Sequence, residues 1–428
     1  IISSFKTASV ASSLSLARME VASGDAAVSY HIIGDAFVDL FCFAEGNLPQ
    51  LGGDSKLSRP VQTMAGGSAT NSATHLMGLL AGSISNGDNG VSNIKSSPVH
   101  LHATINPNDE YGKLLLSHAA QHGYHFWNCV KQQDGNDQNT SAASTGHCLV
   151  IVCQGDRTFM THAGVVDHFS AADINIEPIV VAAAGNNSNS THVHVAGYYN
   201  IFGFWNSKLK ERLEDIRNEH RQQRHHDSDA SSPPLTLSLV PQYDASGEWD
   251  GGLLDLLPLL DFLIMNEDEA NHITKRPTAP LVAVEDGGDD DEIHHWTSFF
   301  RNKDEQHHSS STTTPTWVII TRGKDGAVAI QNGEVCAIQR AVEVNVIDPT
   351  GAGDAFVSGF LHGIYKWRQQ QQECSDECWG VQAVRHGLLW GCSVATCSVL
   401  TRGASVPSST NDIERFVELT KSCRSSKT

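Results

Sequence analysis

The chain has 428 residues, of which 40% are hydrophobic, so it carries enough apolar material to bury a core and is not a wholly disordered protein. Lys and Arg total 29 against 48 Asp and Glu, which gives a formal net charge of −19 at pH 7. This acidic balance argues against a protein that coats nucleic acid or binds a membrane through a basic surface. The net charge does not exclude binding of a small anionic ligand, since a local site can be positive inside an acidic protein.

The first 19 residues contain Lys6, Arg18 and several serines but no acidic residue. This composition is typical of the end of a transit peptide and equally of an unstructured terminus, and both interpretations stay open. We expect residues 1–25 to be a disordered or targeting tail. Ten sparse, irregularly spaced cysteines favour reduced thiols, and so an intracellular protein of the cytoplasm or of a plastid or mitochondrion. The apolar run at 387–400 is too short to span a bilayer.

Short buried strands alternate with helical patterns through most of the chain. Strands are expected at residues 28–33, 99–105, 192–196, 235–240, 262–265 and 317–321, and helices at 72–80, 111–122, 207–224 and 253–260. This alternation predicts an α/β fold with a doubly wound, mostly parallel sheet flanked by helices.

One stretch departs from the alternation. Residues 146–152 and 157–162 read as strands on either side of a short turn at Gly155, which predicts a β-hairpin. A hairpin inserted in an α/β fold often stands outside the main sheet. We therefore expect residues 37–65 and 146–162 to form a small β lid.

Polar, low-complexity stretches interrupt the pattern. They are rich in Ser, Asn, Gln, His, Asp and Thr and lie at residues 83–97, 132–144, 186–190, 220–234 and 283–315. Because such composition cannot bury a core, we predict surface insertions, with one or two helical turns at 293–300. One folded domain would then span residues 26–416, followed by a flexible tail at 417–428.

The most informative stretch is the sequence DPTGAGDAFVSGF at 348–360. A predicted strand at 341–347 precedes it and an apolar helical pattern follows, so Gly351, Ala352 and Gly353 would lie at a strand-to-helix turn. Small residues leave the backbone N–H groups accessible there, and the helix N-terminus adds partial positive charge. This turn predicts an anion site suited to a transferring phosphoryl group.

Asp354 opens the helix that follows the turn. A carboxylate at this position can simply cap the helix. Capping requires neither the small residues before Asp354 nor a second acid at Asp348, whereas a base beside an anion site accounts for both. The pattern therefore favours a catalytic Asp354.

Further polar or glycine-rich segments follow predicted strands, and each also has an ordinary structural interpretation. Residues 66–71 (GGSATN) could form a capped turn or a tight pocket wall with a hydrogen-bonding Asn71. Asp39 could be a solvated turn acid or could accept hydrogen bonds from a polyol. Asn266 and Glu269 share one helix face and could cap that helix or hold Mg²⁺ partly through water.

Absent motifs narrow the choice of enzyme class. The two glycines of TRGKDG at 321–326 are unremarkable in a β–β turn, and neither GxxxxGK[ST] nor GxGxxG occurs in the chain. A P-loop NTPase and a dinucleotide-binding dehydrogenase are therefore disfavoured. Cys374 and Cys378 have no second pair at metal-ligand spacing, so we expect no zinc site.

Taken in chain order, these segments resemble the PfkB, or ribokinase-like, family of carbohydrate and nucleoside kinases. The resemblance runs from about residue 28 to 416. It is carried by D-x-T-G-A-G-D-x-F at 348–356, the Gly-Gly segment at 66–71, N-x-x-E at 266–269, T-x-G-x-x-G at 321–326 and the hairpin at 146–162.

The resemblance implies an ATP-dependent phosphotransferase that acts on an alcohol group of a sugar, with ATP and Mg²⁺ as cofactors. Asp354 would take the proton from the substrate hydroxyl. The anion hole would be lined by Gly351, Ala352 and Gly353. ATP would be bound by Asn266, Glu269, Thr321, Gly323 and Gly326, with Glu269 holding Mg²⁺ through water. The sugar would be bound by Asp39, Gly67, Ser68, Asn71 and Arg157.

The resemblance also implies features beyond the catalytic residues. Many family members use a monovalent cation such as K⁺, which Asp348 and carbonyl groups near Gly403 would hold here. Family members dimerise through lid strands, so the resemblance allows a homodimer of this chain through its lid. An adenosine or other nucleoside kinase remains the alternative enzyme, and an inactive regulator that keeps the fold is the alternative outside enzymes.

Overall fold

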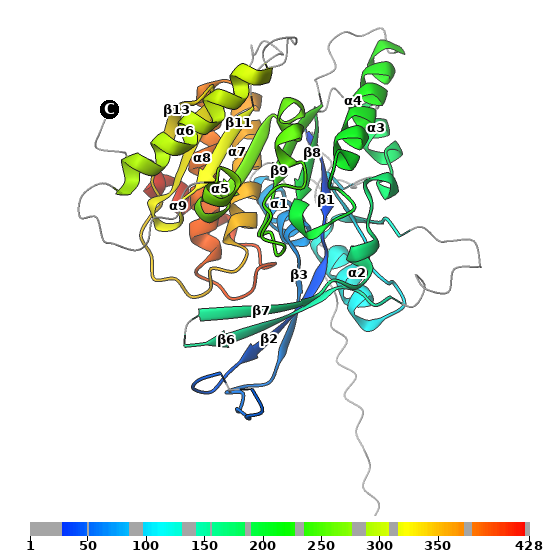
Figure 1. The fold of residues 1–428 in the computed structure, drawn as a ribbon, viewed down its shortest axis with the longest axis vertical. Helices are drawn as coiled ribbons and strands as arrows, with labels where there is room; N and C mark the ends of the chain where they lie inside the picture. Colours follow the sequence, from blue (N-terminus) through cyan, green and yellow to red (C-terminus); the bar gives the residue numbers. More distant parts are fainter. Residues whose placement is uncertain are drawn as a thin grey trace, which may run out of the picture.

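The structure is a computed structural model that describes residues 28–48, 51–84, 97–130, 143–154, 156–184, 190–226, 235–275, 288–307, 316–371 and 379–423. Its larger sheet has nine strands (Figure 1). Their order is β13 (Glu334–Gln339), β12 (Ala327–Gln331), β11 (Trp317–Thr321), β10 (Phe262–Asn266), β9 (Thr236–Val240), β8 (Ser190–Ala196), β1 (Val28–Gly34), β4 (Val99–Ala103) and β5 (His125–Asn128).

The strand order reverses at β1. The seven strands from β11 to β5 run parallel, and β12 and β13 continue the sheet antiparallel. The chain moves from β1 to β4 and β5 on one side and returns to β8 on the other. In open α/β sheets, ligands bind beyond the carboxyl ends of the strands at such a reversal.

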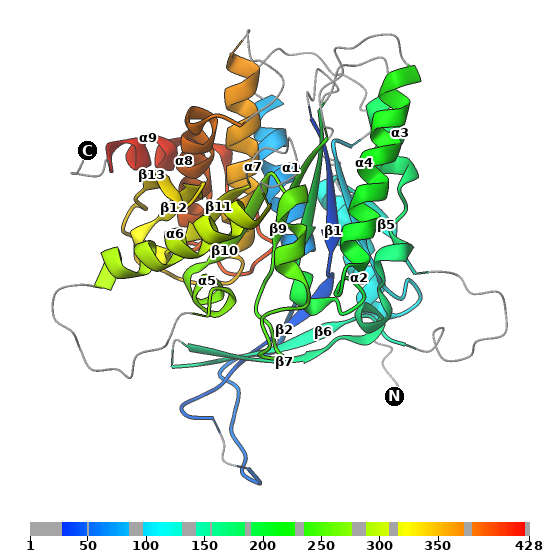
Figure 2. The same ribbon diagram turned by 45° about the horizontal axis from the view of Figure 1, so that its top comes forward.

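Helices cover both faces of this sheet (Figure 2). One layer holds α1 (Ser68–Ile84), α2 (Glu110–His122), α7 (Ala352–Gln370), α8 (Val381–Ser398) and α9 (Thr410–Ser422). The other holds α3 (Glu177–Ala184), α4 (Lys208–His226), α5 (Glu267–Ile273), α6 (Gly288–His307) and the 3₁₀ helix η4 (Leu253–Leu259). The expected doubly wound α/β fold is confirmed.

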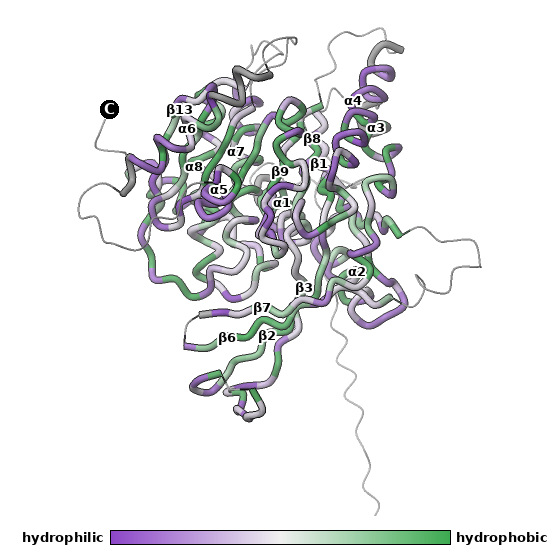
Figure 3. Tube along the Cα trace, in the orientation of Figure 1, coloured by the Kyte–Doolittle hydropathy of each residue, from purple (hydrophilic) through white to green (hydrophobic). Residues whose placement is uncertain are grey.

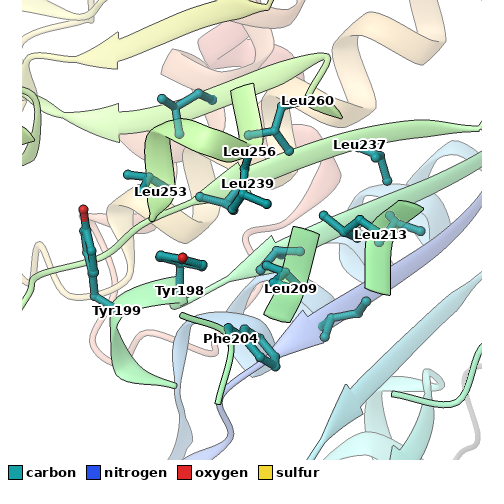
Figure 4. Packing of buried hydrophobic residues seen from close by; sticks show 14 of the residues in the cluster. Tyr198, Tyr199, Phe204, Leu209, Leu213, Leu237, Leu239, Leu253, Leu256 and Leu260 are labelled. Carbon is teal, nitrogen blue, oxygen red and sulfur yellow. The ribbon is translucent and has the colours of Figure 1, made fainter. Parts of the chain in front are cut away.

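The second layer shows how the sequence pattern makes the core. Leu209, Leu213 and Ile216 recur at helical spacing on α4 and are fully buried. Figure 4 shows the first two beside Leu237 and Leu239 of β9. Burying each such side chain contributes about 1.5–3 kcal/mol. The rest of α4 is mostly hydrophilic (Figure 3).

The lid is a second, four-stranded sheet in the order β3 (Gln62–Gly66), β2 (Phe37–Phe43), β6 (His147–Cys153) and β7 (Asp156–His162). Strands β6 and β7 are antiparallel, so the predicted hairpin is confirmed. Strand β2 follows β1 after two residues, so the lid grows directly out of the central strand of the large sheet (Figure 1).

Two expected elements differ from the structure. No strand forms at 341–347: the N–H groups of Ile347 and Asp348 donate to the carbonyl of Val399 instead of a strand ladder, and the Ile347 side chain is 58% exposed. The helix expected at 253–260 is the 3₁₀ helix η4, which contains Pro258.

Two predicted domain features were also wrong. The insertion at 283–315 contains α6, a 20-residue helix whose Trp296 is fully buried and whose Phe300 is 3% exposed. These side chains fill the core of the second layer, so polar composition did not prevent burial. The tail expected from residue 417 instead completes α9, in which Val417 and Thr420 are buried.

Other predictions fall wholly or largely outside the described residues. These are the terminal tail at 1–25, Cys374 and Cys378, and most of the insertions at 83–97, 132–144, 186–190 and 220–234, of which residues 220–226 instead complete α4. Within the described ranges, no helix is both long and apolar enough to cross a membrane.

Candidate active site

The candidate site lies where α1 and α7 begin, beside the carboxyl ends of β1, β9 and β10. Asp354 is in the first turn of α7 and is 6% exposed. Its Oδ1 accepts a hydrogen bond from the Ser68 hydroxyl at 2.6 Å, and its Oδ2 accepts one from the Asn71 amide at 2.8 Å. The start of α1 therefore holds both carboxylate oxygens of a residue at the start of α7.

The environment of Asp354 brings its titration close to neutral pH. Burial raises the pKa of Asp354 to about 7, and the negative charge of Asp35 adds to the rise, while the hydrogen bonds from Ser68 and Asn71 oppose it. A carboxyl group with a pKa near the working pH is well matched to accept a proton. The geometry thus supports Asp354 as a base.

Ser68 and Asn71 were predicted to bind the sugar, and in the structure both donate hydrogen bonds to Asp354. The side-chain oxygen Oδ1 of Asn71 accepts a hydrogen bond from the Ser405 hydroxyl. This contact turns the side-chain NH₂ of Asn71 toward Asp354. These two residues therefore orient the candidate base, and a further contact with substrate stays a proposal.

Gln242 is a residue that sequence reasoning missed. It follows β9 with φ +66°, a left-handed conformation that is strained for a side-chain-bearing residue. Its amide nitrogen lies 2.9 Å from the Ser68 hydroxyl oxygen and 3.4 Å from Asp354 Oδ1. No spacing pattern marks this residue, because its contacts depend on how the loop after β9 folds back.

Gly351, Ala352 and Gly353 form the turn before Asp354, as predicted. Gly351 is the N-cap of the 19-residue helix α7 with φ +74°, and a Cβ there would lie 2.7 Å from the Cβ of Ala404. A Cβ on Gly353 would meet no atom within 4 Å. The Ala352 N–H donates to the Pro349 carbonyl at 3.2 Å, so the helix N-terminus presents its partial positive charge and its other first-turn N–H groups to open space that an anion can enter.

Two further carboxylates belong to the same region. Asp39, predicted to bind the sugar, lies inside lid strand β2 and not in a turn, and burial together with the charges of Asp35, Asp354 and Asp348 raises its pKa to about 7. Asp35, at the end of β1, is 2% exposed and accepts hydrogen bonds from the Ala69 N–H and, at 2.7 Å, from the Asn200 amide.

These acids make the site rich in hydrogen-bond acceptors. Burial also raises the pKa of Asp35. Asp35 and Asn200 were missed although Asp35 directly follows the central strand, where a ligand contact is expected. Gly67, also predicted for the sugar, has φ +89° and packs against the backbone of residues 35–37.

Arg157 reaches the site from lid strand β7. Its guanidinium donates to Asp348 Oδ1 at 2.7 Å and to the Thr350 hydroxyl. Asp348 Oδ1 also accepts from the Thr350 N–H, and its Oδ2 from the Gly403 N–H. These donors hold the pKa of Asp348 below its usual value, although partial burial acts in the opposite direction.

Asn266 and Glu269 form a reciprocal capping box on α5. The Glu269 carboxylate accepts hydrogen bonds from the Asn266 N–H and side-chain amide, at 3.0 and 2.8 Å, while Asn266 Oδ1 accepts from the Glu269 N–H at 2.9 Å. Burial, with the negative charges of Asp354 and Asp268, raises the pKa of Glu269 to about 7.

The donor set around Glu269 fits Mg²⁺ held through water. A buried carboxylate that is repelled by Asp354 is stabilised by a nearby divalent cation. Within the described ranges, no group of three or more His, Cys, Asp or Glu side chains is placed to hold a metal. Mg²⁺ usually keeps several waters and binds substrate phosphates, so one such carboxylate is enough.

Thr321, Gly323 and Gly326 lie at the same edge of the sheet. Thr321 ends β11 in register with Asn266, and the two glycines, with φ +52° and +92°, form the turn into β12. A side chain on Gly326 would collide with the Gln339 carbonyl. The glycines predicted to flank ATP are therefore brought beside Asn266 and Glu269.

Comparisons with known proteins identify the family and the fold. The family model described as pfkB family carbohydrate kinase matches residues 29–411. A ribokinase from Giardia lamblia is 18% identical, with a TM-score of 0.62 over 91% of this chain and 99% of its own. Arabidopsis thaliana ribokinase, solved with ribose and ATP, is 15% identical, with a TM-score of 0.56 over 91% of this chain and 98% of its own.

Two other relatives differ in activity. Adenosine kinase from Sinorhizobium meliloti is 15% identical, with a TM-score of 0.55 over 90% of this chain and 98% of its own. An ATP-dependent 6-phosphofructokinase from Thermoanaerobacterium thermosaccharolyticum is 51% identical over 49 residues, which are 11% of this chain and 15% of that protein. At such low identities the solved structures show the fold alone.

Proposed function

The chain belongs to the pfkB family of carbohydrate kinases, and from this premise we propose that it is an ATP-dependent kinase that phosphorylates an alcohol group of a sugar. The observation that carries the proposal is the buried Asp354, with a pKa near 7, beside an open helix N-terminus. The base and the anion site that phosphoryl transfer needs therefore occupy neighbouring positions.

In the proposed reaction, the substrate hydroxyl oxygen attacks the γ-phosphorus of ATP. The bond from that phosphorus to the β–γ bridging oxygen breaks, ADP leaves, and the hydroxyl proton moves to Asp354. The N–H groups of residues 351–353 and the α7 dipole stabilise charge on the transferring phosphoryl group. Asn266, Thr321, Gly323 and Gly326 would flank ATP. When bound, Mg²⁺ neutralises charge on the phosphates, and Glu269 would hold it through water.

The acidic pocket favours a neutral acceptor. Asp35, Asp39 and Asp354 are acceptors or negative charges, so they suit the hydroxyl groups of a polyol and repel a phosphate on the acceptor. Arg157 is engaged by Asp348 rather than by these acids. This argues for an unphosphorylated sugar over a sugar phosphate, despite the 49-residue match to a 6-phosphofructokinase.

A phosphorylation screen tests the proposal. Wild-type protein and the Asp354→Asn variant are incubated with Mg-ATP and pentoses, hexoses, nucleosides or fructose 6-phosphate. We expect transfer to at least one free sugar by the wild type and a severe loss in the variant. Turnover of a nucleoside but of no free sugar would instead identify a nucleoside kinase. Mg-ATP binding without transfer to any acceptor would favour the inactive regulator.

The homodimer through the lid belongs to this proposal. Leu40, Leu149 and Met160 are register partners across β2, β6 and β7, so they form one apolar row on one face of the lid. Met160 is 59% exposed and Leu149 36%. We expect light scattering after size exclusion to report a dimer for the wild type and a monomer for Met160→Glu. A monomeric wild type would exclude the dimer.

A further inference from the structure

Asp348 accepts four hydrogen bonds from donors of the protein itself. Its Oδ1 accepts from the Arg157 guanidinium at 2.7 Å, the Thr350 N–H at 3.0 Å and the Thr350 hydroxyl at 2.6 Å. Its Oδ2 accepts from the Gly403 N–H at 3.1 Å. The Arg157 and Asp348 side chains are only 19% and 12% exposed, so water screens this ion pair weakly.

These residues do not fit the monovalent cation that the family resemblance implies at Asp348. Such an ion needs oxygen atoms with lone pairs directed at it. Here Asp348 already has a full positive charge at 2.7 Å, and Gly403 turns its N–H rather than its carbonyl oxygen toward the carboxylate. A second cation at this carboxylate would be repelled by the guanidinium.

Building on the function proposed above, we propose that the guanidinium of Arg157 is an internal cation that replaces K⁺ beside the anion hole and ties the lid to the segment that precedes α7. Arg157 lies 191 positions before Asp348, on the lid strand β7. Its single side chain joins Asp348 and Thr350, which lie three positions and one position before the helix N-cap Gly351.

An arginine can pair with Asp348 and donate to Thr350 at the same time, which a lysine can do only in part. The planar guanidinium presents several N–H groups in a fixed fork and can serve two acceptors at once, whereas an ammonium is a compact point charge. The charge also stays at every physiological pH. Arg157 therefore fixes the geometry of residues 348–350 independently of the salt composition. The kinase should consequently work without K⁺.

The first test needs no substrate. The thermal unfolding midpoint of the ligand-free protein is measured in KCl and in tetramethylammonium chloride at equal ionic strength. We expect the same midpoint for the wild type in both salts. Arg157→Met, which leaves Asp348 without its cation, should be specifically stabilised by KCl. The matched control is Arg59→Met, since Arg59 is also a lid arginine but packs over the Phe43 ring, and it should show no salt preference.

Each outcome of this test decides the inference. A K⁺-specific rise in the wild-type midpoint would show that an ion site exists beside the arginine and would overturn the proposal. Equal behaviour of Arg157→Met in both salts would overturn it as well. If Arg157→Met does not fold, Arg157→Lys takes its place: it keeps the charge, so it should be insensitive to K⁺, and a K⁺-specific stabilisation of the lysine variant would contradict an internal cation.

The second test is phosphoryl transfer to the best acceptor with and without K⁺. We expect wild-type turnover to be unchanged and Arg157→Met turnover without K⁺ to fall about ten-fold, as for a lost charge-assisted hydrogen bond, with partial rescue by K⁺. If wild-type turnover depends on K⁺, this inference is wrong, but the kinase proposal is unaffected. A wild-type protein with no transfer activity would contradict the kinase proposal. The thermal unfolding comparison would still test whether Arg157 replaces K⁺.

Discussion

Asp348 and Asp354 lie six residues apart in one segment, yet the protein surrounds their carboxyl groups differently. Asp348 accepts hydrogen bonds from an arginine, a hydroxyl and two backbone N–H groups, which hold its pKa low. Asp354 accepts from the neutral Ser68 and Asn71 in a fully buried place near another acid, and its pKa rises to about 7. One aspartate is fixed as an anion, and the other can exchange a proton.

The difference shows what distinguishes a structural acid from a reactive one. Burial opposes charge at both positions, so the outcome depends on whether the neighbours supply positive charge. Arg157 supplies it to Asp348, whereas Ser68 and Asn71, which donate to Asp354, are neutral. The proposed division of labour is therefore that Asp348 shapes the turn while Asp354 takes the proton.

The largest expected effect is on turnover. Asp354→Asn should lower kcat about 10²- to 10⁴-fold, because general base catalysis typically contributes that much. Asp348→Asn should lower kcat only about ten-fold, as expected when one charge-assisted hydrogen bond is lost. Steady-state assays of both variants with the best acceptor make the comparison. Equal losses would remove the distinction between the two aspartates.

The second effect is on stability, and here Asp348→Asn should be the more damaging of the two variants. Asp348→Asn removes the anion that pairs with Arg157 and should cost about 1–3 kcal/mol of unfolding free energy. Asp354→Asn should be neutral or stabilising at pH 8, because it removes a buried charge that no cation compensates. Urea unfolding at pH 8 measures both. A strongly destabilised Asp354→Asn would mean that its carboxylate is a structural partner of α1.

The third effect concerns how stability changes with pH. A carboxyl whose folded pKa is raised stabilises the fold below its unfolded pKa, and this stabilisation is lost as pH rises through the folded pKa, here about 7. The unfolding free energy of Asp354→Asn minus that of the wild type should therefore be small at pH 5 and positive at pH 8. Groups away from the site titrate alike in both proteins and cancel, whereas Asp39 and Glu269, whose pKa the charge of Asp354 helps to raise, also change in the variant.

Buried histidines make this subtraction necessary. Burial lowers the pKa of His102 and of His194 to about 3, so these groups destabilise the fold as pH falls below their unfolded pKa of about 6.5. The wild-type curve alone mixes both trends. A difference between variant and wild type that stays constant from pH 5 to pH 8 would be evidence against the raised pKa of Asp354.

The smallest effect belongs to Gln242. Gln242→Gly relieves the left-handed backbone but removes the amide that contacts Ser68, so the protein should become slightly more stable while kcat/KM falls about two- to five-fold, a change worth under about 1 kcal/mol. Gln242→Ala keeps the strain and loses the amide, and it should show the kinetic loss without the gain in stability. Unchanged kcat/KM in both variants would show that Gln242 does not help to position Asp354.

Local patterns predicted much of the fold and part of the site. The helix that starts at residue 352, the anion-site turn and the lid hairpin depend on nearby residues, and periodicity or turn chemistry revealed them. The contacts between Ser68 and Asp354, and between Arg157 and Asp348, join residues 286 and 191 positions apart. Only the packed chain brings these pairs together.

The errors have similar causes. Alternating Val and Ile at 342–347 suggested a strand, but the structure pairs this segment with the end of α8 and not with the sheet. Asn266 and Glu269 are not among the errors: the structure shows that they cap α5, and their contact with a ligand stays a prediction. Trp296 and Phe300 were placed in a polar insertion, although two aromatic residues on one face of α6 are enough to bury that helix against the core.

The most direct test is the pH dependence of single-turnover phosphoryl transfer in the wild type and in Asp348→Asn. We predict that transfer is lost as pH falls through about 7 in both proteins, because Asp354 must be ionised and its surroundings persist in the variant. If the acidic limb disappears or moves far in Asp348→Asn, while Asp354→Asn retains it, then Asp348 is the group that titrates and the assignment of the base is wrong.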